Sequence, residues 1–297
     1  MLEKLITIFP SLVKESDVPP SERHLYLFFK VNDQETAAIK KEEISEKERK
    51  VLEVFLDHKT KEASFDPIEK GWYSYLKEDG SPPPQLQELT SFRFYHLEGN
   101  KLYDNKSDVL EALRHYFDME CKCIFLHTHS LLVIVRERKE DPLPAFNAEE
   151  LAGIIAADLL LDVKVYSGRR VHAADNVRYI FEQEKMLFEH ALHLFPKERA
   201  FKDFDMMPFI FPSLKKKEQQ QVFSYALGEL EQEKELLNTL YYFYLSNLNI
   251  SLTAKELHMH RNTLQYRLDK VIEHIGIDIK QFPNAAALYV MLRNQWQ

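Results

Sequence analysis

The middle of the chain carries the pattern that most limits its fold, an ordered series of strand-like and helix-like segments. Apolar residues alternate or run together in the strand-like segments and recur at helical spacing in the others. In the order β-α-β-β-α-β-α, the segments are 92–98, 107–117, 121–127, 131–137, 147–161, 163–168 and 175–195. Ser107 and Asn147 are residue types typical of helix N-caps, and residues 128–130 are short enough for a hairpin loop. This order predicts a ferredoxin-like layer of helices on one sheet.

Two stretches rich in proline or charge separate this series from the rest of the chain. The sequence SPPPQ at 81–85 cannot continue a helix or donate ladder hydrogen bonds, so it predicts a linker, and residues 196–220 predict a second break. Before the linker, 25–31 predicts a strand and 43–58 a helix, whereas every pattern after the second break is helical. We therefore expect an α+β protein with a mixed N-terminal module at 1–84, a ferredoxin-like domain at 85–212 and an all-α domain at 213–297.

Composition narrows the class of protein. A hydrophobic content of 45% with 29% charged residues is typical of a globular chain. No apolar run approaches the roughly 20 residues that cross a bilayer, and the N-terminal segment lacks the pattern of a signal peptide. The two cysteines, Cys121 and Cys123, are too close together to staple a fold, which indicates a reducing compartment. These features predict a cytoplasmic protein that does not enter a membrane.

Charge is distributed unevenly along the chain. The net charge is −8, which argues against a basic coat over the whole molecule. Residues 232–297 nevertheless contain seven Lys or Arg against six Asp or Glu. A polyanion would therefore meet the least repulsion at the C-terminal end.

That end contains two amphipathic segments around a polar turn. The residue types at Thr253 and Glu256 fit a capping box and predict the start of a short helix, and 259–262 predicts the turn. A second helix from near Thr263 would place its apolar residues on one face and end at Gly276. A short helix, a tight turn and a longer helix form the outline of a helix-turn-helix, in which the start of the second helix enters the major groove of DNA.

Polar side chains gather where that second helix begins. Arg can bond bidentately to guanine and Asn or Gln to adenine, and each good pair contributes about 1–3 kcal/mol of base discrimination. Thr, Tyr and Arg side chains and the first backbone N–H groups can hold phosphates. The candidate DNA-binding residues are Ser251, Thr253, His260, Arg261, Asn262, Thr263, Gln265, Tyr266 and Arg267. The same outline also fits a helical hairpin that docks a partner protein and never meets DNA.

A continuous string joins the two segments, TAKELHMHRNTLQYRLDKVIEHIG at 253–276, and AALYVMLR follows at 286–293. With the core His-Arg-Asn-Thr-Leu-x-Tyr-Arg-Leu intact at 260–268, residues 236–293 resemble the C-terminal helix-turn-helix of the PucR/CdaR family of bacterial transcription regulators. The first helix starts with Thr253, bulkier than the alanine that family members often have. The resemblance implies a regulator that binds double-stranded operator DNA through this end. A homodimer is expected, because one short helix reads only a few base pairs.

The middle segment resembles the degenerate GGDEF-like domain of the same family. A working diguanylate cyclase carries Gly-Gly-Asp/Glu-Glu-Phe at the central hairpin, where this chain reads His-Thr-His-Ser at 127–130. Neither the glycines nor the acids are present there, so we expect a scaffold or dimerisation layer and no enzyme. By analogy, the N-terminal module would receive a small-molecule effector, whose identity the sequence does not give.

Two further clusters contain residue types that occur in binding sites. Cys121, Cys123, His127 and His129 are metal-ligand types, but four points along one straight strand cannot surround one ion. Buried cysteines without a metal are therefore expected, and no cofactor is implied. The aromatic run at 241–244 could stack on single-stranded bases, but four consecutive helical residues point in every direction, which favours core and helix packing.

Overall fold

The computed structural model of the chain describes residues 8–14, 17–19, 22, 25–32, 35–45, 48, 57–58, 66–78, 80–118, 121–137 and 147–295. The chain forms two compact units, Met1–Asp66 and Pro67–Gln297. No helix among these described residues is both long and apolar enough to cross a membrane.

The first unit contains a small antiparallel sheet. Its strands lie in the order β1-β3-β2-β4 and are β1 (Val13–Lys14), β2 (Tyr26–Asn32), β3 (Glu35–Lys40) and β4 (Asp57–His58). Phe29 and Ile39 are buried in its core, as the apolar pattern of strand β2 leads one to expect. The strand predicted at 25–31 is confirmed. The helix predicted at 43–58 lies mostly outside the described residues, and its last two residues belong to β4.

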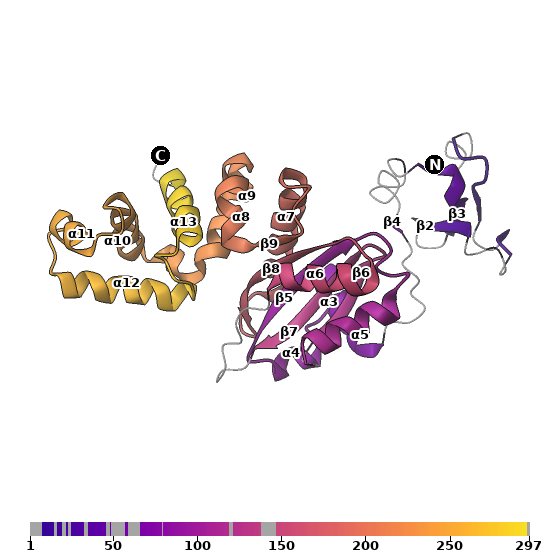
Figure 1. Ribbon diagram of the computed structural model, residues 1–297, viewed down its shortest axis with the longest axis horizontal. Helices are drawn as coiled ribbons and strands as arrows, with labels where there is room; N and C mark the ends of the chain where they lie inside the picture. Colours follow the sequence, from indigo (N-terminus) through magenta and orange to yellow (C-terminus); the bar gives the residue numbers. More distant parts are fainter. Residues whose placement is uncertain are drawn as a thin grey trace. The chain divides into compact units, whose positions relative to one another are not determined.

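A five-stranded sheet forms the centre of the second unit (Figure 1). In the order β6-β7-β5-β8-β9, its strands are β6 (Cys121–His127), β7 (Ser130–Glu137), β5 (Ser91–Gly99), β8 (Val163–His172) and β9 (Ala200–Lys202). Strand β9 pairs parallel to β8, and all other neighbours are antiparallel. All four predicted strands and the hairpin are present. The ferredoxin-like and GGDEF-like classifications stay predictions.

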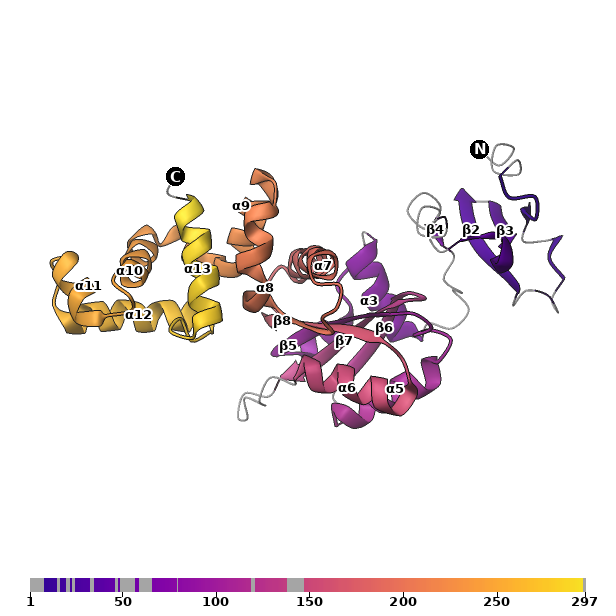
Figure 2. The same ribbon diagram turned by 45° about the horizontal axis from the view of Figure 1, so that its top comes forward.

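Helices cover both faces of this sheet (Figure 2). On one face lie α5 (Lys106–Tyr116) and α6 (Ala148–Leu159), and on the other α3 (Pro67–Lys77) and α7 (Val177–Leu194). The side chain of Asn147 caps α6 by accepting a hydrogen bond from the Glu149 N–H (3.0 Å), as predicted. The N-cap predicted at Ser107 is wrong, because α5 already begins at Lys106.

The boundary of the first unit lies just before α3 and not at the predicted linker, because α3 is buried in the second unit. Trp72 of α3 is 1% exposed, and its ring packs edge-on against the Phe92 ring with 6.1 Å between the ring centroids. Helix α3 therefore belongs to the second unit, although the sequence pattern predicted it in the N-terminal module. Part of the stretch 81–85 is not a linker but the start of α4 (Pro84–Glu88). Proline is tolerated there because the first N–H groups of a helix have no intrahelical acceptor.

The break predicted at 196–220 is also wrong. Besides β9, this stretch forms α8 (Asp203–Ile210), the 3-10 turn η5 (Phe211–Ser213) and the start of α9 (Lys216–Leu227). Met207 and Ile210 are fully buried, so apolar burial outweighs the disruptive effect of the prolines in this segment. The segment is a structural joint between the sheet and the helices that follow.

The C-terminal helices continue from that joint. They are η6 (Gly228–Gln232), α10 (Lys234–Leu245), α11 (Ile250–Glu256), α12 (Arg261–Ile275) and α13 (Phe282–Gln295). Helix α12 lies beside α10 and α11, and α13 packs against α8 (Figure 1). One continuous cluster of buried apolar side chains reaches from the α7 face of the sheet to Leu264 and Leu268 of α12. The helix-turn-helix is therefore built onto the same core as the sheet.

Candidate nucleic-acid interface

The first helix of the motif is α11. Its N-cap is Asn249, whose side-chain oxygen accepts a hydrogen bond from the Leu252 N–H (3.1 Å). The capping box predicted at Thr253 is wrong because the helix begins one turn earlier. Thr253 is fully buried and its hydroxyl donates to the Asn249 carbonyl oxygen (2.8 Å). This hydrogen bond removes the Thr253 side chain from the surface, whereas Ser251 is exposed.

A left-handed residue closes α11 and turns the chain toward α12. His258 has a φ of 51°, a conformation that costs energy for any residue with a Cβ. Two hydrogen bonds stabilise it, from the His258 N–H to the Lys255 carbonyl (3.2 Å) and from the Met259 N–H to the Ala254 carbonyl (2.9 Å). These are the bonds of a Schellman motif. The turn therefore ends at His260, two residues earlier than predicted.

Helix α12 begins at Arg261, and His260 is its N-cap. The Nδ1 atom of His260 accepts a hydrogen bond from the Asn262 N–H (3.2 Å). Leu264, Leu268 and Val271 are fully buried, as predicted, so one face of the helix is committed to the core. Gly276 ends the helix in the left-handed conformation, with a φ of 73°, which confirms the predicted C-cap.

The opposite face of α12 is open at its N-terminal end. His260, Arg261, Asn262 and Thr263 are exposed, and Tyr266 is 69% exposed. A helix start with exposed Arg and Asn side chains can donate to phosphates and bond to base edges.

The outward face changes character further along α12. Asp269 and Glu273 are exposed carboxylates, and Gln265 is half-buried and donates to the Asp269 carboxylate (2.7 Å). Negative charge there repels a polyanion. Only the first two turns of the helix are therefore suited to contact DNA.

Arg267 lies differently from the other candidate residues. Its side chain is 29% exposed, and its guanidinium donates to the Glu235 carboxylate (3.0 Å) and to the Thr239 hydroxyl (3.3 Å), both on α10. These contacts hold α12 on α10. A phosphate contact by Arg267 would have to compete with Glu235.

Other polar contacts hold the helices of the motif together, and no sequence pattern indicated them. The Ser246 hydroxyl donates to the Glu256 carboxylate (2.9 Å), which ties the end of α10 to α11. Asn247, with a φ of 51°, lets the Leu248 N–H donate to the Phe243 carbonyl (2.9 Å) in a second Schellman motif. Burial raises the pKa of Tyr244, so its hydroxyl stays protonated and donates to the Ile279 carbonyl (3.3 Å).

The aromatic run at 241–244 and the Cys/His group at 121–129 both take part in packing contacts. Phe243 is fully buried, and the rings of Tyr241 and Tyr289 stack with 6.1 Å between their centroids. These contacts confirm core and helix packing for the aromatic run. Cys121 and Cys123 are buried free thiols, and the rings of His127 and His129 stack at the hairpin. Across the part of the chain that the structure describes, no group of three or more His, Cys, Asp or Glu side chains is placed to hold a metal ion.

The fold and the exposed start of α12 define a helix-turn-helix protein of the kind found in transcription regulators. Residues 236–293 match the PucR C-terminal helix-turn-helix domain. Over 99% of both chains, the sequence is 31% identical to the uncharacterized protein YxkF of Bacillus subtilis (strain 168). The chain belongs to the PucR/CdaR family of bacterial transcription regulators.

Two relatives with assigned regulatory names match part of the chain. The carbohydrate diacid regulator of Escherichia coli (strain K12) is 32% identical over 33% of this chain and 26% of its own length. The purine catabolism regulatory protein of Bacillus subtilis (strain 168) is 41% identical over 24% of this chain and 13% of its own length. A crystal structure of a regulator of polyketide synthase expression from Bifidobacterium adolescentis has a TM-score of 0.41 and 15% identity, covering 78% of this chain and 94% of that one.

Proposed function

We propose that this transcription regulator binds duplex DNA sequence-specifically, with the N-terminal end of α12 in the major groove. The observation that carries the proposal is the exposure of Arg261, Asn262 and Thr263 at the start of a helix whose other face is buried. The side chains of Arg and Asn match the donor and acceptor pattern of guanine and adenine. The match to a PucR-type helix-turn-helix supports the same function.

The protein acts in the cytoplasm as a homodimer and is not an enzyme. One helix reads only a few base pairs, so two copies on paired half-sites supply the needed specificity. The first unit, Met1–Asp66, receives a small-molecule effector. Phosphate contacts around the base-reading residues come from Ser251, His260 and Tyr266, and also from Arg267 in competition with Glu235.

The test is a fluorescence-polarisation titration of the full chain with DNA from its own upstream region and with a shuffled duplex. Specific proteins bind their sites roughly 10³-fold or more tighter than other sequences, and their affinity falls as salt rises. We expect both behaviours. Equal affinity for the two duplexes, or no binding at low salt, would reject DNA reading and favour a helical hairpin that docks a protein.

Arg267 and Glu235 provide a sharper test of the phosphate contacts. Arg267→Ala removes one cation and should weaken binding to every sequence, lowering the salt slope by about 1. It should also lower the free energy of unfolding by about 1 kcal/mol, because it breaks the link to α10. The measurements are polarisation at several salt concentrations and urea unfolding.

The matched variant is Glu235→Gln, which frees the Arg267 guanidinium without removing it. If Arg267 reaches a phosphate, Glu235→Gln should bind all duplexes more tightly than the unmodified chain. An unchanged or weaker affinity of Glu235→Gln for the duplexes would show that Arg267 has only a structural role.

A further inference from the structure

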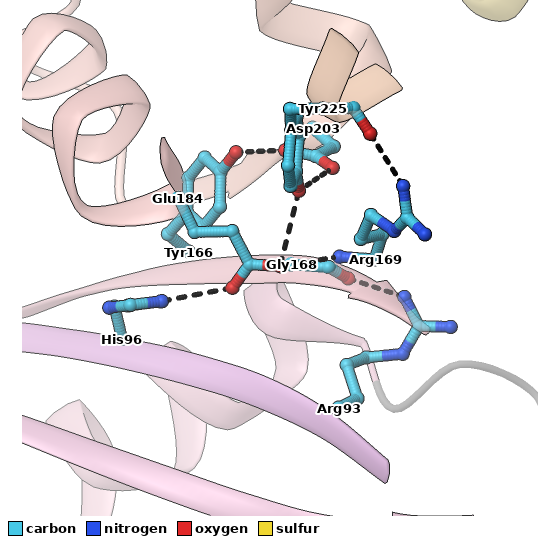
Figure 3. Close-up of polar contacts among 8 residues, drawn as sticks. All are labelled: Arg93, His96, Tyr166, Gly168, Arg169, Glu184, Asp203 and Tyr225. Atoms are coloured by element: carbon cyan, nitrogen blue, oxygen red, sulfur yellow. Dashed lines mark hydrogen bonds and ion pairs between the residues drawn. The ribbon is translucent and has the colours of Figure 1, made fainter. Parts of the chain in front are cut away.

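A group of polar side chains lies buried between the central sheet and the helices that lead to α12 (Figure 3). We call it the carboxyl cluster; its members are His96 on β5, Tyr166 on β8, Glu184 on α7, Asp203 on α8 and Tyr225 on α9. Glu184 is fully buried and Asp203 is 6% exposed. Carboxyl groups this deep are rare and need partners for every oxygen.

The strand backbone makes room for Glu184. Phe94 on β5 faces both Gly168 and Arg169 on β8, which is a β-bulge. The bulge lets the Arg169 N–H donate to one Glu184 carboxyl oxygen (3.0 Å). A Cβ on Gly168 would lie 2.1 Å from the other oxygen, so the carboxyl group rests directly on the glycine backbone.

The positions of the oxygen atoms require a carboxyl proton. The Tyr225 hydroxyl oxygen lies 3.1 Å from Glu184 Oε1 and 2.5 Å from Asp203 Oδ2 (Figure 3). A hydroxyl carries one hydrogen and can donate it to only one of these two oxygens. A proton on the other oxygen, donated to Tyr225, completes the arrangement, whereas without it two acceptors face each other in a buried site.

The remaining partners do not supply that proton. Tyr166 donates its hydroxyl hydrogen to Asp203 Oδ1, and His96 Nε2 lies 3.0 Å from Glu184 Oε2. Burial lowers the pKa of His96 to about 3, so the imidazole is neutral and does not balance a second negative charge. Burial raises the pKa of Glu184 to about 8 and that of Asp203 to about 7, where the charge of Glu184 adds to the effect.

We infer that Glu184 and Asp203 retain a shared proton in the native protein at neutral pH, and that this proton holds α8 and α9 onto the sheet. Loss of the proton leaves two carboxylates facing one hydroxyl, and their repulsion separates α8 from α7 and β8. Because α13 packs against α8, the joint also supports the helices around α12. The inference does not depend on DNA binding.

Charged groups on β5, β8 and α7 act on the cluster. Arg93 on β5 donates to the Gly168 carbonyl, and Arg169 on β8 donates to the Tyr225 carbonyl, so both place positive charge beside the site. On α7, Lys185 and Glu189 influence His96 with opposite signs. The two arginines lower the pKa of Glu184, but burial has the larger effect.

The sign of the pH dependence follows from these directions. The raised pKa values of Glu184 and Asp203 mean that the native state binds more protons than the unfolded chain, so their stabilising contribution is fully present below the ordinary carboxyl pKa near 4 and is lost progressively as the pH rises to about 7 to 8. The lowered pKa of His96 acts in the opposite direction, and its contribution is lost as the pH falls from about 6.5 toward 3. The two effects oppose each other between about pH 4 and 6.5, so the net decline in stability should fall between about pH 6.5 and 8, and these groups add no pH dependence above that range.

Infrared spectroscopy of the full chain tests the inference directly. At about pH 6, exposed carboxyl groups with ordinary pKa values near 4 are ionised, so a remaining carboxylic-acid C=O band reports a buried proton. We expect this band, and we expect it to disappear as the pH rises through about 7 to 8. Absence of the band in the unmodified chain would overturn the inference without any variant.

Two isosteric variants assign the band. Glu184→Gln and Asp203→Asn replace a protonated carboxyl with a neutral amide, so each should weaken the band and flatten the decline of the unfolding midpoint between about pH 6.5 and 8. In Glu184→Gln the remaining Asp203 should titrate at lower pH, because the charge that raises its pKa is gone. Glu182→Gln is the control, since its carboxylate lies on the same helix and is exposed. A band and a pH profile unchanged in both cluster variants would refute the shared proton.

Discussion

Gly168→Ala is expected to lower the free energy of unfolding by roughly 3–5 kcal/mol. The new Cβ would meet the buried Glu184 carboxyl at 2.1–2.2 Å. The carboxyl group can move away only by giving up the Arg169 N–H, the Tyr225 hydroxyl or His96. Each partner would then be left unsatisfied in a buried site.

Gly153→Ala is the matched control for this substitution. Gly153 lies on the exposed side of α6, and a Cβ there would meet nothing within 4 Å. Alanine should raise helix stability by about 0.5–1 kcal/mol. Urea unfolding followed by circular dichroism compares the two. A Gly168→Ala protein as stable as Gly153→Ala would show that Glu184 does not rest on the strand.

The second large effect concerns DNA. Arg261→Ala and Asn262→Ala should each reduce the preference for the operator by about 1–3 kcal/mol, or roughly 5- to 150-fold, while affinity for shuffled DNA changes little. Both side chains are exposed, so thermal stability should stay within about 0.5 kcal/mol of the unmodified chain. Polarisation titrations with operator and shuffled duplexes measure the ratio.

Glu273→Ala controls for changes on α12 that lie away from the base-reading end. Its side chain is exposed near the end of the helix and adds negative charge there. Operator preference should therefore be unchanged, with overall affinity equal or slightly higher. If Glu273→Ala lost specificity as strongly as Arg261→Ala, the contact would not be confined to the first turns.

Local periodicity was sufficient to predict much of the fold. The four main strands of the second unit follow from short apolar runs, and the buried face of α12 follows from the spacing of Leu264, Leu268 and Val271. Gly276 was placed by its freedom to adopt a positive φ. In each case one local rule and the tertiary environment favour the same structure.

Errors arose where a residue type has two common uses. Thr253 is a residue type typical of N-caps, but Asn249, which lies one turn earlier, is the N-cap of α11. Prolines at 83–84 and 208 suggested breaks, whereas buried residues such as Leu86 and Met207 fix helices there. Sequence patterns do not record which surface a helix will meet.

The carboxyl cluster lies beyond sequence reasoning for a related physical reason. Glu184 falls within a helical pattern in which an acidic residue suggests solvent, and its partner His96 is 88 positions away. Only the packing of α7 on β8 reveals that Gly168 and Glu184 touch. Likewise, Arg267 was predicted to face phosphate, and only the packing of α12 on α10 shows that Glu235 already binds its guanidinium.

The most direct test of the central claim is a dimethyl sulfate protection experiment on the operator, because this reagent methylates guanine N7 in the major groove. The unmodified protein should protect guanines in paired half-sites about one helical turn apart. Arg261→Ala should lose protection at one guanine per half-site while phosphate contacts persist. Retention of the full protection pattern by Arg261→Ala and Asn262→Ala, or protection confined to the minor groove, would contradict base reading by α12.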